Sequence, residues 1–394
     1  MTIIEPLASS VGSRRMGVGT SSLADSFAAG VEAATNAVQA DTVVLIIFAS
    51  ARYDLAAIAA GARTVAPASQ TIGCTSAGEL TANGPTERSL VIIAIEGHGV
   101  SVSTGSAVAI NGDLRTASAT ATRCIEWADR RAHSVVLLLS DGLAGRQQDI
   151  VRGAYQQVGA EFRLVGACAS DNVGTHQNRL LHNGTEFTDC VVAAIISSDA
   201  PIGIGVGHGW SPVGAPMMVT DSESVLIRTL DGEPALDRYL TALGAPQEIW
   251  DDPSLFSGFA ITRPLGLARR GRAEVRCVQT ADYEARTITC YAEIPRGAMT
   301  MFMRGDDASV LDAAGVACTE ALDDLDGAPA IGMVAFDCMA RRAVMGNRLS
   351  EEIQRIRELA GPVPLAGFYS AGEIARTEGP NGFHNQTLVV MAMA

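Results

Sequence analysis

Apolar residues are concentrated in several continuous runs that are rich in β-branched side chains. The run at residues 42–49 reads TVVLIIFA, and others occupy 89–95, 134–139, 188–196 and 387–393. A strand that is covered on both faces has this pattern, because neither face has to carry polar residues. We therefore predict buried strands at these positions.

Between these runs, apolar residues recur at the spacing of amphipathic helices. Phe27, Val31, Ala34 and Val38 are an example, since residues three or four apart share one face of a helix. In contrast, Asn183-Gly184 lies between two apolar segments and predicts the turn of a β-hairpin. The predicted helices lie at residues 25–38, 54–63, 113–130, 146–158, 308–322 and 345–360.

Three similar loops follow predicted strands: TIGCTSAGEL at 71–80, LVGACASDN at 164–172 and PLAGFYSAGEI at 364–374. Each comes after a succession of strand, helix, strand, helix and strand, so we predict about three β-α-β-α-β-β repeats. A short strand–helix–strand link implies a parallel pair. The predicted fold class is α/β, with mixed, mostly parallel sheets in two domains. The first domain, 15–220, holds two repeats, and the second, 221–394, holds the third repeat and extra strands.

The composition excludes several classes of function. The chain has 394 residues, 47% of them hydrophobic, and a formal net charge of −14, which disfavours nucleic acid and anionic membranes as partners. All 29 cationic residues are arginine. Without lysine there is no Walker A phosphate loop, Schiff-base lysine or Ser-Lys hydrolase.

Cysteine usage and hydropathy indicate the compartment. The eight cysteines form no Cys-x-x-Cys pair, so a zinc knuckle or a redox dithiol is not expected. The first 17 residues lack the apolar core of a signal peptide, and no apolar stretch reaches the roughly 18 residues that span a bilayer. We expect a soluble, reduced, cytoplasmic protein with no membrane association.

Four further motifs are IGCTSAGE at 72–79, FDC at 336–338 followed by Arg341-Arg342, GFYSAGEI at 367–374, and HNQT at 384–387. They resemble motifs of the FIST domain family, in both its N-terminal and its C-terminal parts. The resemblance extends from about residue 20 to the end of the chain. It implies a sensory module that binds small molecules such as amino acids and is linked to signalling proteins.

The resemblance also implies an alternative, because some relatives look like haem-binding nitric-oxide sensors that regulate a partner histidine kinase. No kinase, methyl-accepting or cyclase segment follows in this sequence. Any signal would therefore pass to a separate partner, such as a histidine kinase or another signalling protein. No cofactor is expected on the first interpretation, and haem on the alternative.

We expect the three loops to deliver their side chains to one shared hollow, because open α/β sheets bind ligands at the carboxyl ends of their strands. Glu373 is suited to hold a ligand ammonium, and Arg341 to clamp a carboxylate. The competing interpretation is tight turns with capping carboxylates and an internal Arg341–Glu373 pair. The candidate ligand-binding residues are Ser76, Glu79, Cys338, Arg341, Tyr369, Ser370, Gly372, Glu373 and Asn385.

Catalysis and metal binding are weaker hypotheses. The glycine before Ser370 lies three residues back, so the Gly-x-Ser-x-Gly pattern of a nucleophile elbow is absent, and no catalytic residue is assigned. An enzyme with Ser370 and Glu373 in its active site remains an alternative. The histidines show no metal-ligand spacing, and His208 or His384 is the candidate axial ligand if haem binds.

Overall fold

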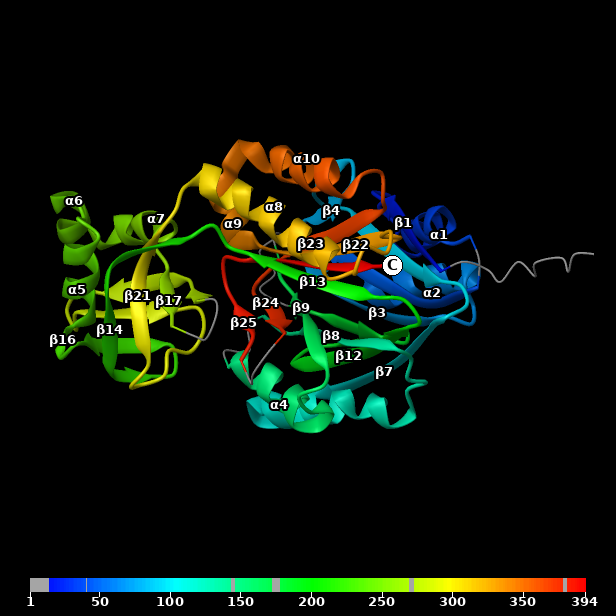
Figure 1. Cartoon of the computed structure of the whole chain (residues 1–394), viewed down its shortest axis with the longest axis horizontal. Coiled ribbons are helices and arrows are strands. Elements are labelled where there is room, and N and C mark those ends of the chain that lie inside the picture. The colour runs from blue at the N-terminus through cyan, green and yellow to red at the C-terminus, as the bar shows by residue number, and fades with distance from the viewer. Residues whose placement is uncertain (1–13, 40, 143–145, 172–177, 269–272, 378–380) are drawn as a thin grey trace, which may run out of the picture.

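The computed structural model describes residues 14–39, 41–142, 146–171, 178–268, 273–377 and 381–394. It has a mixed α/β fold, and its sheets contain both parallel and antiparallel pairs. Figure 1 shows a larger part, built of sheets with helices on the outside, and a smaller part at its left. The smaller part, residues 211–304, is called the inserted unit below. No helix in the described ranges is both long and apolar enough to span a bilayer.

Three six-stranded sheets form the larger part, and their strands follow the same order. In each, a parallel pair lies at the centre, two antiparallel strands extend it on one side, and a short hairpin extends it on the other. Sheet 1 consists of β1 (Arg15–Ser21), β6 (Leu90–Glu96), β2 (Thr42–Ser50), β3 (Gln70–Ser76), β10 (Leu180–His182) and β11 (Thr185–Phe187). Sheet 2 consists of β7 (Val100–Val108), β12 (Cys190–Ser198), β8 (His133–Ser140), β9 (Arg163–Cys168), β24 (Glu373–Arg376) and β25 (Phe383–His384). Sheet 3 consists of β13 (Ile202–Gly207), β26 (Leu388–Met393), β22 (Gly332–Cys338), β23 (Leu365–Ser370), β4 (Glu79–Thr81) and β5 (Gly84–Thr86).

The hairpins are exchanged among the sheets in a closed ring. The β4–β5 hairpin follows β3 of sheet 1 but pairs with β23 of sheet 3. The β24–β25 hairpin follows β23 but pairs with β9 of sheet 2, and β10–β11 follows β9 but pairs with β3. Each of the three loops predicted to carry the site lies between a central strand and its exchanged hairpin. The exchange therefore draws all three loops to the place where the sheets meet.

The expectation of mostly parallel sheets is wrong. Among the described residues, each of the three sheets contains one parallel pair, and its other pairs are antiparallel. The reason is that β6, β12 and β26 return antiparallel beside the first central strand, and the exchanged hairpins add antiparallel pairs on the other side. The predicted hairpin turn is confirmed: Asn183 and Gly184 both have positive φ between β10 and β11.

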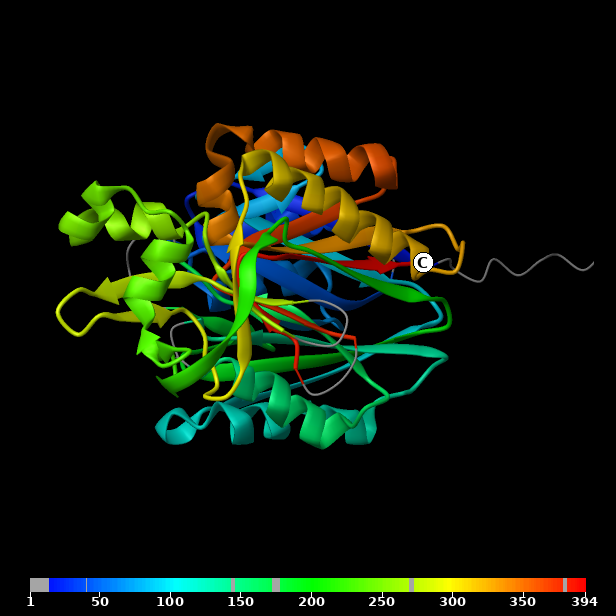
Figure 2. The same cartoon turned by 60° about the vertical axis from the view of Figure 1, so that its left-hand side comes forward.

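The inner faces of the three sheets share one apolar core, in which Phe48, Phe336 and Phe368 are fully buried. Helices cover the outer faces, so the central strands are apolar on both sides, as their sequences predicted. Figure 2 shows helices of sheet 3 on one side of the molecule and those of sheet 2 on the opposite side. The helices are α1 (Ser26–Ala37) and α2 (Leu55–Val65) on sheet 1, α3 (Leu114–Ala121) and α4 (Gln148–Val158) on sheet 2, and α8 (Asp307–Asp323) and α10 (Leu349–Ala360) on sheet 3.

Alternating glycines in β13 let α8 approach the sheet closely. A Cβ on Gly205 would lie 1.8 Å from the carbonyl oxygen of Ala317, and one on Gly203 would lie 2.0 Å from that of Ala321. Because these atoms are backbone atoms, no side-chain movement relieves the overlap. These glycines are therefore explained by helix–sheet packing.

The inserted unit has its own sheet and its own apolar core. The sheet packs against α5 (Ala235–Ala242), α6 (Gln247–Asp251) and α7 (Phe256–Ala260). The chain enters it after β13 and returns to sheet 3 through α8, so sheet 3 combines strands from both predicted domains. Its strands are β14 (Ser211–Glu223), β15 (Leu226–Leu230), β16 (Glu233–Pro234), β17 (Leu265–Leu267), β18 (Glu274–Arg276), β19 (Val278–Asp282), β20 (Thr287–Cys290) and β21 (Met299–Arg304).

Candidate functional site

The structure brings the three loops together. Each loop follows a central strand, β3, β9 or β23, and is joined to the others by backbone hydrogen bonds. The N–H of one loop donates to a carbonyl of another from Ala77 to Tyr369 (3.1 Å), from Ser170 to Thr75 (3.1 Å) and from Cys168 to Gly372 (2.8 Å). The carboxyl ends of three strand pairs thus meet at one place.

An opening was expected beside Glu373 and Arg341, but both side chains are fully buried. Phe383 of an exchanged hairpin helps to close the loop: a Cβ on Gly372 would lie 2.4 Å from its Cζ. Gly372 therefore accommodates a phenyl ring in this structure, where a ligand was expected. The other predicted site residues are also buried, with exposures of 0% for Ser76, Glu79, Tyr369 and Ser370, 1% for Asn385 and 3% for Cys338.

Glu79 is held by serine hydroxyls. Ser76 Oγ donates to one of its carboxylate oxygens and Ser89 Oγ to the other. Burial raises the pKa of Glu79 to about 7, although the hydrogen bonds from Ser76 and Ser89 lower it. This carboxyl group therefore gains or loses its proton near neutral pH.

Glu373 repeats this arrangement in the third loop. Ser370 Oγ donates to Oε1 at 2.7 Å, and the N–H of Thr387 donates to Oε2 at 3.2 Å. Burial, and then the charge of Asp337, raise the pKa of Glu373 well above its usual value, against the hydrogen bonds from Ser370 and Cys338. Glu373 is thus a buried carboxyl group whose pKa is shifted in the same direction as that of Glu79.

Arg341 does not pair with Glu373. It lies on α9 (Met339–Met345), one helical turn after Asp337, and its Nε donates to Oδ1 of that carboxylate at 2.6 Å. Its Nη2 donates to Glu352 of α10 and to the carbonyl of Val310 at 3.2 Å. Burial alone lowers the pKa of Arg341, but its two carboxylate partners more than offset this and raise it. Both predicted partners of Arg341, a ligand carboxylate and Glu373, are replaced by this buried cluster.

Tyr369 belongs to the packing between the first and third loops. The guanidinium of Arg342 lies 5.1 Å from the centre of the Tyr369 ring and donates to the carbonyl of Ala77. Arg342 also pairs with Glu87 at the surface. Burial raises the pKa of Tyr369 far above its usual value. Tyr369 is therefore a buried link between loops.

Sequence reasoning missed four residues around Glu373 and Cys338. They are Asp141 and Cys168 from sheet 2, and Cys277 and Tyr291 from the inserted unit. Burial, with a smaller effect of the Glu373 charge, raises the pKa of Cys277 to about 12; burial raises that of Cys168 to about 12 as well. Cys277 and Tyr291 are half-buried, so the cluster approaches solvent on this side. We call Cys168, Cys277, Cys338 and Glu373 the thiol–carboxyl cluster.

No local motif marks this cluster, since its cysteines lie far apart in the sequence and come from different sheets. Asp141 accepts a hydrogen bond from Asn178 at 3.1 Å, and the hydroxyl of Ser140 lies 3.3 Å from the sulfur of Cys168. Over the described stretches of the chain, no group of three His, Cys, Asp or Glu side chains is placed to hold a metal ion.

Asn385 has unused hydrogen-bonding capacity beside the cluster. Its side chain is 1% exposed, yet neither its Oδ1 nor its Nδ2 has a partner among the described residues. A Cβ on Gly372 would lie 3.4 Å from this Nδ2, so the amide lies against the third loop. The backbone N–H of Asn385 donates to the carbonyl of Val275 in the inserted unit at 3.2 Å. The amide is thus located where the third loop meets the inserted unit.

The two candidate haem ligands are held by backbone groups. His208 Nδ1 accepts the N–H of Trp210 at 3.0 Å, and Nε2 of His384 lies 3.2 Å from the carbonyl oxygen of Ala375. His384 is 7% exposed. One ring nitrogen of each histidine is thus already in contact with a backbone group.

Comparison with known proteins gives a family. The FIST N domain matches residues 43–233, and the FIST C domain matches residues 235–376. An uncharacterised protein of Mycobacterium tuberculosis (strain CDC 1551) is 26% identical over 262 residues, which cover 66% of this chain and 68% of the relative. An uncharacterised protein of Mycobacterium bovis is also 26% identical over 262 residues, with 66% and 67% covered.

Similarity to solved structures is weak. A cyanuric acid hydrolase from A. caulinodans aligns over 97% of this chain and 99% of its own, at 9% identity and a TM-score of 0.30.

Proposed function

Because the chain belongs to the FIST family, whose domains are associated with sensory signal transduction, we propose that it is a small-molecule-binding sensory protein that acts through a separate partner. The observation that carries the proposal is the buried Asn385 amide, which has no hydrogen-bond partner among the described residues and lies against the third loop. A histidine kinase or another signalling protein is the proposed partner.

A bound polar ligand would stabilise the region around the Asn385 amide. A buried polar group without a partner costs about 1–3 kcal/mol, so a molecule that pairs with the amide of Asn385 recovers part of that cost. A ligand would approach from the side of Cys277 and Tyr291, because both side chains are half-buried. The matching strand order of the three sheets supports an origin by triplication, which would explain why three loops converge here.

The contacts of the charged side chains favour a neutral polar ligand. Among the described residues, Arg341 is paired with Asp337 and Glu352, and Glu373 accepts hydrogen bonds from Ser370 and Thr387. An amino-acid-like ligand fits the proposal where its amide or hydroxyl groups pair with the Asn385 amide. We propose a small polar metabolite of this kind.

A thermal-shift screen of amino acids and related polar metabolites tests the proposal, since a ligand that binds only the folded state raises the melting temperature. Asn385→Ala should remove most of the shift given by a ligand that the wild type binds. Gln354→Ala, at an exposed position of α10, is the matched control and should leave the shift unchanged. If the ligand raised the melting temperature of Asn385→Ala as much as that of the wild type, the ligand would not bind at Asn385 and the proposed site would be wrong.

Adding haem to the same screen tests the alternative of a haem-dependent gas sensor. That alternative predicts a Soret band that disappears on replacement of His208 or His384, while the first proposal predicts none. The enzyme alternative requires turnover that is lost in Ser370→Ala. A cytoplasmic location is part of our proposal and is supported by the eight cysteines, all of which are free thiols.

A further inference from the structure

The two chain connections between the larger part and the inserted unit touch each other. One passes through Gly209 and Trp210 after β13, and the other passes through Gly305 before α8. A Cβ on Gly305 would lie 2.6 Å from Cε3 of Trp210, so the indole packs directly on this glycine. Gly209 has a φ of +80°, which is readily adopted by glycine. Because the two connections are in contact, the inserted unit is joined to the larger part at one place, which can act as a hinge.

Apolar contacts between the two parts lie at this hinge and beside sheet 2. Trp210 packs with Val275 and Met303 of the inserted unit and with Val310 of α8. The core of the inserted unit is separate from the core shared by the three sheets, but Tyr291 and Ala292 of the unit pack against the outer core of sheet 2 beside Phe383. Rotation about the hinge would leave the unit's own core and the shared core intact and would break this small apolar contact.

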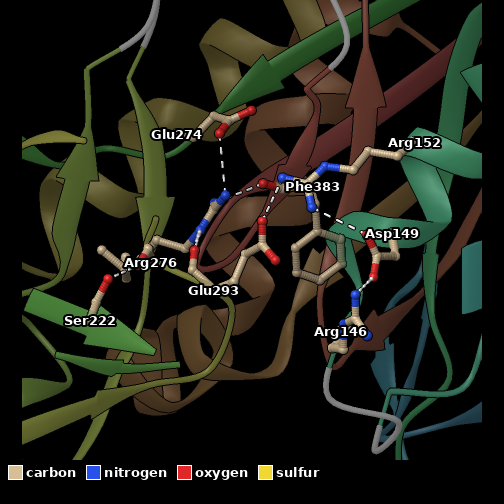
Figure 3. A network of polar contacts seen from close by, with 9 residues as sticks. Arg146, Asp149, Arg152, Ser222, Glu274, Arg276, Glu293 and Phe383 are labelled. Atoms are coloured by element: carbon tan, nitrogen blue, oxygen red, sulfur yellow. Dashed lines mark hydrogen bonds and ion pairs between the residues drawn. The ribbon is translucent and has the colours of Figure 1, made fainter. Parts of the chain in front are cut away.

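A second set of contacts, away from the hinge, is polar and is shown in Figure 3. Arg152 of α4 donates to Glu293 of the inserted unit at 2.5 Å and to Asp149 at 3.2 Å. Asp149 also pairs with Arg146 at 2.7 Å. The side chain of Arg152 is 33% exposed and that of Glu293 is 18% exposed. An ion pair with this much exposure is weak and sensitive to salt.

Arg276, whose side chain is buried, adds further hydrogen bonds between the inserted unit and the larger part. Its Nη1 donates to the carbonyl of Phe383 at 2.8 Å, and its Nε donates to the backbone carbonyl of Glu293 at 3.2 Å. Its Nη2 pairs with Glu274 at 3.2 Å. Phe383 belongs to the hairpin that closes over Gly372. The hydrogen bonds of Arg276 therefore connect the inserted unit to the hairpin whose Phe383 ring covers the third loop.

The thiol–carboxyl cluster is divided between the two parts. Cys277 belongs to the inserted unit, whereas Cys168, Cys338 and Glu373 belong to the larger part. Asn385 also lies on the larger part and bonds to the backbone of Val275 across the boundary. Movement of the inserted unit would therefore separate Cys277 from the rest of the cluster and break the backbone hydrogen bond of Asn385.

We propose that the inserted unit is a lid, hinged where Trp210 packs on Gly305 and latched by the Arg152–Glu293 ion pair, which opens to admit the ligand to the thiol–carboxyl cluster. This inference rests on the proposed function for its purpose, but the motion itself can be measured without any ligand. It explains how a site whose side chains are buried exchanges a guest with solvent.

Site-resolved labelling of cysteines by N-ethylmaleimide tests the lid. In Glu293→Gln, labelling of Cys277 and Cys338 should be roughly fivefold faster than in the wild type, because a weak ion pair that restrains opening has been removed. Cys124, in the short helix at residues 122–127, and Cys318, on α8, are buried against sheets 2 and 3 and should label at the wild-type rate. Mass spectrometry of the digested protein reports each site separately.

Two further measurements guard against a general loss of structure. Arg355→Ala removes the exposed Arg355–Asp312 pair between α10 and α8, which does not involve the inserted unit, and should leave the labelling of every cysteine unchanged. Raising the salt concentration with the unaltered protein should speed labelling at Cys277 and Cys338, and by a smaller factor in Glu293→Gln. The salt series needs no variant to fold.

Two results would overturn the lid. In one, Cys277 and Cys338 label equally fast in the wild type and in Glu293→Gln, with no response to salt. In the other, Cys124 and Cys318 accelerate together with them, which indicates global unfolding. A lid that opens while the ligand screen finds nothing would refute the proposed function alone, and a ligand bound without selective labelling would refute the lid alone.

Discussion

Glu79→Gln should remove a pH dependence of stability that the wild type carries. Burial raises the pKa of Glu79 from 4.5 to about 7 in the folded state. Between these values the unfolded chain has lost the proton while the folded protein retains it, so the free energy of unfolding falls as the pH rises. A difference of roughly 2.5 units corresponds to about 3 kcal/mol at 1.36 kcal/mol per unit.

This contribution is fully present below pH 4.5, falls through the interval from 4.5 to 7, and is absent above it. A glutamine amide has no proton to lose in this interval and can accept a hydrogen bond from one serine. The free energy of unfolding of Glu79→Gln, minus that of the wild type, should therefore rise by about 3 kcal/mol from pH 4.5 to 7.5. Glu373 titrates with the same sign, but its contribution cancels in the difference.

Urea denaturation at intervals of half a pH unit measures this difference. Glu284→Gln is the matched control, because Glu284 is exposed in the turn between β19 and β20, and its difference curve should be flat. A flat curve for Glu79→Gln as well, or one that falls with pH, would refute the reasoning that burial dominates over the hydrogen bonds from Ser76 and Ser89.

Two further substitutions test the packing around the loops. Arg341→Met should lower the free energy of unfolding by about 3–5 kcal/mol, because Asp337 and Glu352 then lose their buried cation. Gly367→Ala should cost about 3 kcal/mol or more, because its Cβ would lie 1.8 Å from the carbonyl oxygen of Ala335 and force β22 and β23 apart. Urea denaturation at pH 7 measures both.

Each of these has a control of the same chemical type. Arg355→Ala breaks an exposed pair with Asp312 and should cost less than about 1 kcal/mol. Gly258→Ala, in α7, places its Cβ where no atom lies within 4 Å and should be neutral or slightly stabilising. If Arg341→Met cost no more than Arg355→Ala, the buried cluster would not depend on its arginine. Equal effects at Gly367 and Gly258 would refute the close-packing argument.

Several buried strands of the three sheets were predictable from the sequence. Residues 42–49, 134–139 and 387–393 correspond to β2 (Thr42–Ser50), β8 (His133–Ser140) and β26 (Leu388–Met393). Their uninterrupted apolar runs are required by burial between the shared core and the outer helices, so local composition was sufficient. The likeness of the three loops was also visible, and the structure brings these loops into contact.

The partners of the site residues were not predictable in the same way. Arg341 and Glu373 were expected to face each other because both lie at the carboxyl ends of neighbouring strands. The turn of α9 instead directs Arg341 back to Asp337 and towards Glu352 on α10. Spacing along one chain does not reveal which helix packs against another.

The sequence by itself determined the family, the class of secondary structure and the three loops, because each of these depends on residues that are neighbours in the chain. Only the tertiary structure decided that the hairpins are exchanged, that Phe383 covers Gly372, and that Cys277 approaches Glu373. These features join segments separated by long stretches of sequence, and their energy lies in packing and burial that no local pattern records.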